Sequence, residues 1–431
     1  MQIPFFISED FLHYVWKHKL FNLQNLTTED GQLLQILNEG MHNHESGPDF
    51  SNAKIQIGNL TWAGNVEVHI NSSDWFAHNH QNDPVYQKAI LHVVWNNNKQ
   101  VFDNLNNPIP TLVLNGRVSS SLLAKYDKLI LNRNEIMCSD SIPSVNKFEF
   151  FSWLNRLLIE RLEVKTSALQ EIYSSTKGNW EQTFFIVFCK NFGFKTNQEG
   201  MMALSRNLDF KILLKNKDDL FKLESLLFGV AGFLGQEFKE EYPINLQKEY
   251  RHQKHKYNLE EIPVEFWKFG RIRPSGFPTI RLSQLANLIH IQGNLFDAYV
   301  RNIPASLDVI QSVEVSTYWN THFTFLNPGQ VKKKSLGKSA VQNLLINTVA
   351  PMMFFYGQET GSLEFRDKAL DLLEKLPAEN NFIIRNWAQN NIFADNAFES
   401  QSLIQLTNNY CTLKKCLNCG IGNQVLKHEV G

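Results

Sequence analysis

Side chains that can bind a metal are concentrated between residues 39 and 92 of this 431-residue chain. Asp49 follows Pro48 at the expected start of a strand, and Glu67 and His69 lie two residues apart on the next strand. Residues two apart on a strand point to the same face of the sheet. An Asp and a Glu that face one way on neighbouring strands can share a hard divalent cation such as Mg²⁺ or Mn²⁺.

The spacing of apolar residues in this part of the chain changes from the helical period to the alternation of a strand, and then back to the helical period. Thr28 as a cap and Gly40 as a stop predict the second helix, and Gly58-Asn59 predicts the turn of a hairpin. The nearly all-apolar run at 89–95 is typical of a strand covered on both faces. The expected elements, in order, are helices over 8–21 and 28–39, strands over 51–57 and 60–70, a helix over 74–89, and strands over 89–95, 100–103 and 111–115.

Helical periodicity takes over from about residue 147 onward, and Pro and Gly separate the helical segments. The fold class we predict is an α/β or α+β N-terminal module with a small mixed sheet, followed by a mainly α-helical region. The module covers 1–140, a linker lies at 140–145, and the helical domain covers 147–431 with a C-terminal cysteine cluster.

The pair Pro48-Asp49, followed after a hairpin by Glu67-Val68-His69, resembles the motif of the PD-(D/E)XK nuclease superfamily. The resemblance implies that Asp49 and Glu67 bind a metal and that His69 occupies the position usually held by Lys. It further implies an additional ligand from Glu39 on the preceding helix. Polar residues on the helix after the second motif are implied too, and here these are Gln81, Asp83 and Tyr86, of which Tyr86 would contact substrate.

A longer pattern, GPDF…GNVEVH…DW..H.H..D..Y…LHVV, is similar to an uncharacterised bacterial family of unknown function with a GPDF…GxVEVH signature. This similarity covers most of the chain, including the helical part and the terminal cysteines. It implies membership of that family and brings no assigned activity.

Other interpretations of the same residues stay open. Asp49 can form an Asx-turn, and Glu67 with His69 can belong to a solvated sheet face. His78, His80 and Asp83 can form the centre of a zinc or iron hydrolase, because imidazole and carboxylate suit both metals. His78 and His80 could share a metal only in a loop, since positions i and i+2 of a helix point apart. His92, inside an apolar strand, reads as a hydrogen-bonded core histidine.

A basic stretch at 248–281 holds eight Lys and Arg against four Asp and Glu. Arg271, Arg273 and Arg281 bracket a Pro/Gly loop, and interleaved aromatic residues could stack on bases. Pairing of these arginines with carboxylates inside the protein is the alternative. The first part of the chain is acidic and the rest is basic. Residues 1–140 hold 9 basic and 14 acidic residues, whereas the whole chain holds 42 and 43.

The C-terminal tail carries Cys411, Cys416 and Cys419, and this Cys-x4-Cys-x2-Cys spacing indicates a site for Zn²⁺ or an iron–sulfur cluster. Cys138 is the best candidate for the fourth ligand, ahead of Cys189 and His428. Some nucleases of the superfamily named above hold an iron–sulfur cluster with one remote and three clustered cysteines, so the arrangement is similar. Reduced thiols packed in a C-terminal turn are the alternative.

No signal peptide and no run of about 18 apolar residues is found, so we expect a cytoplasmic protein without membrane contact. The first functional hypothesis is a metal-dependent phosphodiesterase acting on DNA or RNA. The second is a non-catalytic nucleic-acid-binding or scaffold protein that retains a nuclease-like fold. The third is the zinc or iron hydrolase around His78, His80 and Asp83.

Overall fold

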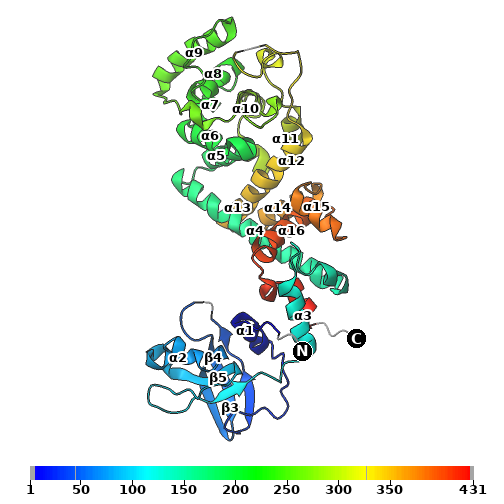
Figure 1. Ribbon diagram of the computed structural model, residues 1–431. Helices are drawn as coiled ribbons and strands as arrows, with labels where there is room; N and C mark the ends of the chain where they lie inside the picture. The colour runs from blue at the N-terminus through cyan, green and yellow to red at the C-terminus, as the bar shows by residue number, and fades with distance from the viewer. Residues whose placement is uncertain (1–4, 44, 327, 428–431) are drawn as a thin grey trace. The chain divides into compact units, whose positions relative to one another are not determined.

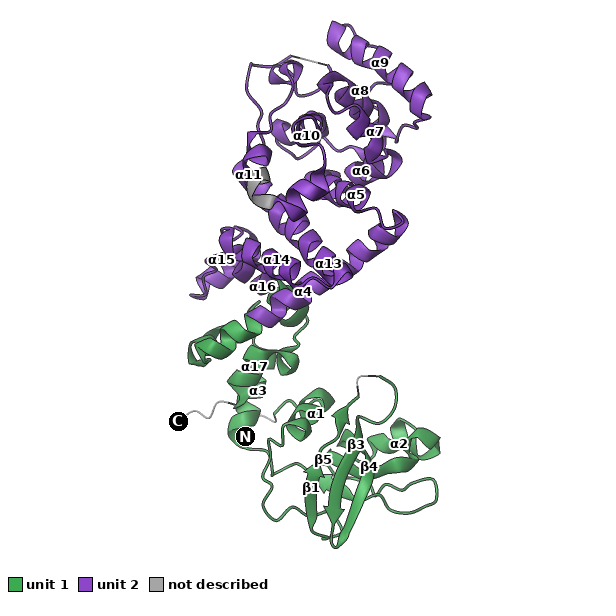
Figure 2. Ribbon diagram, turned by 180° about the vertical axis from the view of Figure 1, so that it is seen from behind, with its two compact units in different colours: residues 1–154, 405–431 green, residues 155–404 purple. Residues whose placement is uncertain are grey.

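The computed structural model describes residues 5–43, 45–326 and 328–427. The chain divides into two compact units, which Figure 2 shows in different colours: residues 1–154 with 405–431, and residues 155–404. The first unit contains the sheet and the second is helical. The cysteine tail therefore belongs by its contacts to the first unit, whereas the sequence boundaries placed it in the helical domain.

The first unit is built on a mixed six-stranded sheet, and this confirms the predicted fold class (Figure 1). The strand order is β1-β3-β4-β5-β6, with β2 paired to β3. The pairs of β3 with β1, β2 and β4 are antiparallel, whereas β4–β5 and β5–β6 are parallel. The strands are β1 (Leu34–Asn38), β2 (Met41–His42), β3 (Phe50–Ile57), β4 (Leu60–Asn71), β5 (Ala89–Asn96) and β6 (Thr111–Val113).

The helix predicted over 28–39 is wrong. Thr28 and Gln32 close a turn in which Gly31 has a φ of 84°, and the chain then enters β1. Leu34 pairs with Ile57 of β3, and both side chains are buried. Pairing between residues that lie 16 to 23 positions apart in the chain overrides the local helical pattern.

The segment after β4 also differs from the long helix that the sequence predicts. It forms the single turn α2 (Asp74–Ala77), then η1 (His80–Asn82) and η2 (Pro84–Lys88), both 3₁₀-helical. Asn79 between α2 and η1 has a φ of 61°, which ends the α-helix there.

The remaining helices of the first unit lie before the sheet, after it, and in the C-terminal tail. α1 (Glu9–Lys17) begins as the sequence predicts, with the Ser8 side chain accepting a hydrogen bond from the amide of Phe11. Its buried face consists of Phe11, Leu12, Tyr14, Val15 and Trp16. The others are α3 (Ser120–Leu131), η3 (Ser139–Ser144), the π-helical turn η9 (Thr407–Cys411), η10 (Cys416–Asn418) and α17 (Gly420–Lys427).

The helices of the second unit pack around a core rich in aromatic residues, which includes Phe184, Phe188 and Phe192. Its first helix, α4 (Lys147–Ser175), starts in the first unit. Within the described ranges, no helix combines the length and apolar character needed to cross a membrane. The other α-helices are α5 (Trp180–Phe192), α6 (Phe194–Asn207), α7 (Phe210–Lys215), α8 (Leu220–Val230), α9 (Glu241–Tyr257), α10 (Pro278–Gln292), α11 (Ile303–Ser312), α12 (Lys338–Leu344), α13 (Ala350–Thr360), α14 (Leu363–Lys375), α15 (Phe382–Gln389) and α16 (Ala397–Leu406), with π-helical turns at η6 (Asp297–Arg301) and η8 (Leu345–Val349).

Candidate metal centre

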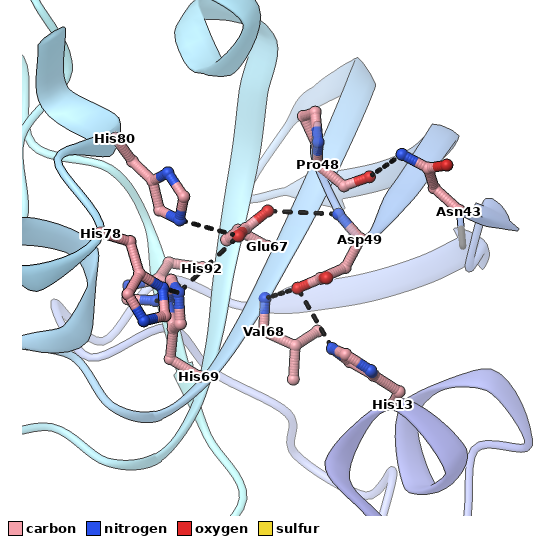
Figure 3. A network of polar contacts seen from close by, with 10 residues as sticks. All are labelled: His13, Asn43, Pro48, Asp49, Glu67, Val68, His69, His78, His80 and His92. Atoms are coloured by element: carbon pink, nitrogen blue, oxygen red, sulfur yellow. Dashed lines mark hydrogen bonds and ion pairs between the residues drawn. The ribbon is translucent and has the colours of Figure 1, made fainter. Parts of the chain in front are cut away.

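Hydrogen bonds made by Asp49 and Glu67 connect the start of β3 to β4 (Figure 3). The carboxylate of Asp49 accepts a hydrogen bond from the amide of Val68 at 2.9 Å. In return, the amide of Asp49 donates to Oε2 of Glu67 at 3.2 Å. Oδ2 of Asp49 also lies 3.2 Å from Nε2 of His13, which comes from α1. The two carboxylates predicted from sequence are therefore neighbours, and a histidine from a third element joins them.

Glu67 faces a group of histidines on its other side. Its Oε1 lies 3.2 Å from Nε2 of His80 and 3.7 Å from Nε2 of His69, and its side chain is almost fully buried. The contact with His80 is close, but the imidazole N–H is not aligned for a hydrogen bond. A buried nitrogen in such a position suits a metal ligand.

Three imidazoles converge beside Glu67. One donor atom from each of His69, His78 and His80 lies within 4.8 Å of the other two, and Nε2 of His69 is 3.1 Å from Nδ1 of His78. His78 ends α2 and His80 begins η1, so the break at Asn79 separates them. That break is the non-helical connection that the sequence argument required for the pair to share a metal.

His92 supports this group from the neighbouring strand β5. It is fully buried, and its Nε2 lies 2.8 Å from Nδ1 of His69, which confirms the prediction of a hydrogen-bonded core histidine. Burial lowers the pKa of His69 to about 4 and lowers the pKa of His92 well below its ordinary value. Both imidazoles are therefore neutral near pH 7, and His69 can offer the lone pair of Nε2 while Nδ1 is oriented by His92.

The two carboxylates differ in their protonation behaviour. Burial raises the pKa of Glu67, and the negative charge of Asp49 raises it further. Burial alone would raise the pKa of Asp49, but the contacts with His13 and the Val68 amide outweigh it and hold this pKa below its ordinary value. Burial likewise opposes protonation of His13, yet its contact with Asp49 raises the pKa of His13 overall. The Asp49–His13 pair thus favours the ionised carboxylate with a protonated imidazole.

Comparison with known proteins adds a family and no activity. Residues 9–382 match the family model described as "Protein of unknown function (DUF2851)". The chain belongs to this family. No curated protein and no solved structure matches it. This confirms the expectation that the chain belongs to a family of unknown function.

Two acidic residues that the sequence suggested as metal ligands, Glu39 and Asp83, have partners outside the histidine cluster. Oε2 of Glu39 pairs with Nζ of Lys19 at 2.9 Å, and this lysine lowers the pKa of Glu39. Glu39 follows β1 and not a helix, because the predicted second helix does not form. Asp83 caps η2 by accepting a hydrogen bond from the amide of Val85. The described cluster therefore unites His78 and His80 with His69 and Glu67, and Asp83 is not part of it.

Tyr86 lies directly against the cluster. Its ring stacks on His80 with 3.8 Å between the ring centres. Burial raises the pKa of Tyr86 to about 12, with further contributions from Glu67 and Asp49, so its hydroxyl stays protonated. Tyr86 can therefore donate a hydrogen bond to a group bound beside His80.

His13 is a member of the site that sequence reasoning missed. It lies 36 residues before Asp49, on a helix whose spacing indicated only an amphipathic face. The clustering of eight histidines in the first 92 residues was the one available signal. It could not show which of them faces Asp49.

The three arginines of the basic stretch have different environments. Arg271 and Arg273 are exposed in the loop before α10, and no described ion pair includes them. Arg281 lies inside the second unit, where it donates to Oε1 of Gln284 at 2.8 Å and packs over Phe194. Burial lowers the pKa of Arg281 to about 10. Arg271 and Arg273 are thus available to an external ligand, whereas Arg281 has interior partners.

Four of the five cysteines lie near one another in the first unit. Cys138 precedes η3, and the electrostatic influence of its thiol reaches Cys411, Cys416 and Cys419 of the tail. Burial raises the pKa of Cys138 and of Cys416 to about 12, with nearby thiols adding to the increase. Among described donors, no three of these sulfurs approach one another as closely as the three imidazoles do.

Backbone amides lie against the sulfur of Cys419. Burial raises the pKa of Cys419, and hydrogen bonds from the amides of Ile421 and Gly422 to its sulfur oppose this increase. The chain is tight here, because a Cβ on Gly422 would lie 2.1 Å from the carbonyl oxygen of Cys416. Donors that point at sulfur stabilise a thiolate, which is the form that binds a metal.

Proposed function

We propose that this chain is a metal-dependent phosphodiesterase acting on nucleic acid, with its metal held by Glu67, His69, His78 and His80. The observation that supports this proposal most directly is the convergence of three imidazoles and one carboxylate next to the Asp49–His13 pair. The order of strands and the positions of Asp49 and Glu67 agree with the nuclease resemblance of the motif.

The donor set favours a transition metal over Mg²⁺. Mg²⁺ prefers oxygen ligands and keeps several waters, whereas imidazole suits Zn²⁺ and Fe²⁺ better. The neutral state of His69 and the unaligned nitrogen of His80 both fit a ligand role. We therefore propose Zn²⁺ for this site, in place of Mg²⁺ or Mn²⁺.

The bound metal would polarise the scissile phosphate and acidify a water molecule. Around it, each protein group has a role that follows from its contacts. Asp49 holds His13 by the contact at 3.2 Å, and the imidazole can then donate a proton to the leaving oxygen. His92 fixes the orientation of His69, and Tyr86 can hydrogen-bond a phosphate oxygen.

A cleavage assay tests the proposed function. Purified full-length protein is incubated with Mn²⁺, Zn²⁺ or Mg²⁺ and with single- and double-stranded DNA and RNA. We expect cleavage with Zn²⁺ and at least tenfold less with Mg²⁺. Tight nucleic-acid binding without cleavage under every metal would favour the non-catalytic alternative. Hydrolysis of simple phosphate or carboxyl esters, with nucleic acid left intact, would favour a zinc or iron hydrolase.

The exposed arginines give a separate prediction about binding. We expect the double substitution Arg271→Ala with Arg273→Ala to weaken DNA or RNA binding and to reduce the slope of log K against log salt by about 1 to 2, because each phosphate contact releases counterions. Fluorescence anisotropy at several salt concentrations measures both quantities. Arg366→Ala serves as the control and should leave the slope unchanged; Arg366 lies in the same unit, over the ring of Phe354. An unchanged slope in the double variant would exclude phosphate contacts by this loop.

We also propose a structural metal at the cysteines, with Cys138, Cys411, Cys416 and Cys419 as its ligands. The support is the convergence of one remote and three clustered thiols in one unit. The Cys-x4-Cys-x2-Cys spacing together with Cys138 suits either a single Zn²⁺ or an iron–sulfur cluster.

A further inference from the structure

A pocket of about 570 Å³ lies in the second unit, and none of its lining residues belongs to the metal centre. It is formed by α4, α5, α6 and the segment from α12 to α13. Its volume is in the range of sites for small organic ligands. The described polar lining contains three lysines, four amides and no carboxylate: Lys165, Lys190, Lys195, Asn191, Gln198, Asn343 and Asn347.

Lys165 lacks a counter-ion in this pocket. Its ammonium lies 3.0 Å from Oδ1 of Asn347 and 3.1 Å from Oε1 of Gln401, and both of these oxygens are uncharged. Arg161, one turn earlier on α4, donates to the same oxygen of Gln401 at 2.6 Å. None of the described ion pairs includes either cation. Glu379, whose carboxylate accepts from the amide nitrogen of Gln401, compensates the charge of these two cations only in part, and this costs free energy in a partly buried position.

The amide that faces Lys165 is held in place by an unusual piece of backbone. Asn347 lies in the π-helical turn η8, and its side chain donates to the carbonyl of Asn343 at 3.1 Å. The side chain of Asn191 on α5 donates to the carbonyl of Asn347 at 3.0 Å and to Oγ1 of Thr348 at 2.9 Å. π-helical turns are rare in proteins, and those that occur are often found at functional sites. The polar wall of the pocket is therefore preorganised.

The remaining lining is apolar. Leu169 and Ile172 come from α4, Val187 from α5, Phe194 from the start of α6, and Pro351 from α13. A ligand that suits this pocket combines an anionic group with an organic part, because the lining offers both cations and hydrocarbon. Lysines act as point charges for phosphate, and several of them match a dianion better than a single carboxylate.

We propose that this pocket binds a phosphate-bearing organic small molecule, with Lys165, Lys190 and Lys195 directed to the phosphate. This inference does not depend on the metal centre or on nuclease activity. The anion would supply the charge that Lys165 lacks, and the apolar residues would hold the organic part.

Binding at this pocket should be coupled to proton uptake. Burial, with a smaller contribution from the charge of Arg161, lowers the pKa of Lys165 to about 7, while Glu379 opposes the change. The other charged groups around the amine are Lys190 on α5 and Lys195 on α6, and α12 and η8 contribute only amides to the lining. A phosphate dianion favours the protonated amine and raises this pKa, so Lys165 takes up a proton when the ligand binds at about pH 8.

Isothermal titration calorimetry of the full-length protein tests the proposal with three probes: inorganic phosphate, phenyl phosphate and AMP. At about pH 8 we expect phenyl phosphate or AMP to bind roughly tenfold more tightly than inorganic phosphate, because only the organic phosphates use the apolar lining. Repeating the titration in two buffers of different ionisation enthalpy should show uptake of close to one proton per site. If none of the three phosphates binds at millimolar concentration, or if only an oligonucleotide binds, the proposal is overturned.

Substitutions separate binding from structure. Lys165→Met should stabilise the free protein, because it removes an amine whose burial is unfavourable, and should abolish both binding and proton uptake. Lys190→Met and Lys195→Met should weaken binding and leave proton uptake per bound ligand unchanged. Lys211→Met, on the exposed face of α7, is the matched control and should change neither. Undiminished proton uptake by the Lys165→Met protein would contradict the assignment.

Discussion

Replacing Glu67 with glutamine is expected to reduce metal-dependent cleavage by about 10³-fold or more, which corresponds to about 4 kcal/mol of transition-state stabilisation. Oε1 of Glu67 is the carboxylate oxygen nearest to the imidazole group, at 3.2 Å from His80 and 3.7 Å from His69. An amide keeps the shape of the carboxylate but removes the negative charge that a cation requires. Metal affinity measured by calorimetry should fall together with the rate.

The control for this substitution is Glu29→Gln, which changes an exposed carboxylate in the same unit. It should leave metal affinity and cleavage unchanged. Thermal unfolding of both variants checks that the fold is retained, since Glu67 also accepts the amide hydrogen of Asp49. Full activity of a folded Glu67→Gln protein would remove Glu67 from the catalytic centre.

Lysine at position 69 distinguishes two roles of His69. If His69 only replaced the usual Lys of the nuclease motif, His69→Lys would keep or raise activity. The structure places His69 between His92 and His78, at 2.8 Å and 3.1 Å, in a buried position. A lysine there would bring a charge next to two imidazoles and remove one metal donor, so we expect metal affinity to fall at least tenfold. Activity at or above the wild-type level would show that His69 stands in for Lys.

Local patterns in the sequence were enough for part of the fold and of the site. Alternation over 51–57 and 60–70 predicted β3 and β4, because side chains on a strand with one buried face must alternate. The same alternation placed Glu67 and His69 on one face. The apolar run at 89–95 likewise predicted β5, which lies between β4 and β6.

The parts that the sequence did not predict depend on contacts between distant residues. β1 reads as a helix until its pairing with β3 is known. His13 reaches Asp49 only through the placement of α1, and the two contact each other across 36 positions. The union of His78 and His80 with His69 depends on a left-handed residue, Asn79, whose conformation is not evident from residue type alone. These features are set by tertiary structure, which outweighs local preference.

The cysteine cluster gives the prediction with the second largest effect. Cys416→Ser is expected to remove the metal and to lower the melting temperature of the first unit by roughly 10 °C, which is about 3 kcal/mol for a unit of this size. The physical reason is that the metal would connect the start of η3 with a tail that follows it by more than 270 residues. Without a metal, four neighbouring thiols offer one another only weak hydrogen bonds.

The measurement is elemental analysis of anaerobically purified protein, together with differential scanning calorimetry. Wild-type protein should contain stoichiometric iron or zinc at this site, and iron together with acid-labile sulfide would identify a cluster. Cys189→Ala is the matched control, because Cys189 is a fully buried thiol of the second unit whose pKa is raised by burial alone. It should lose some stability through a small cavity and no metal. Cys416→Ser protein with unchanged metal content and melting temperature would show that the four thiols only pack against one another.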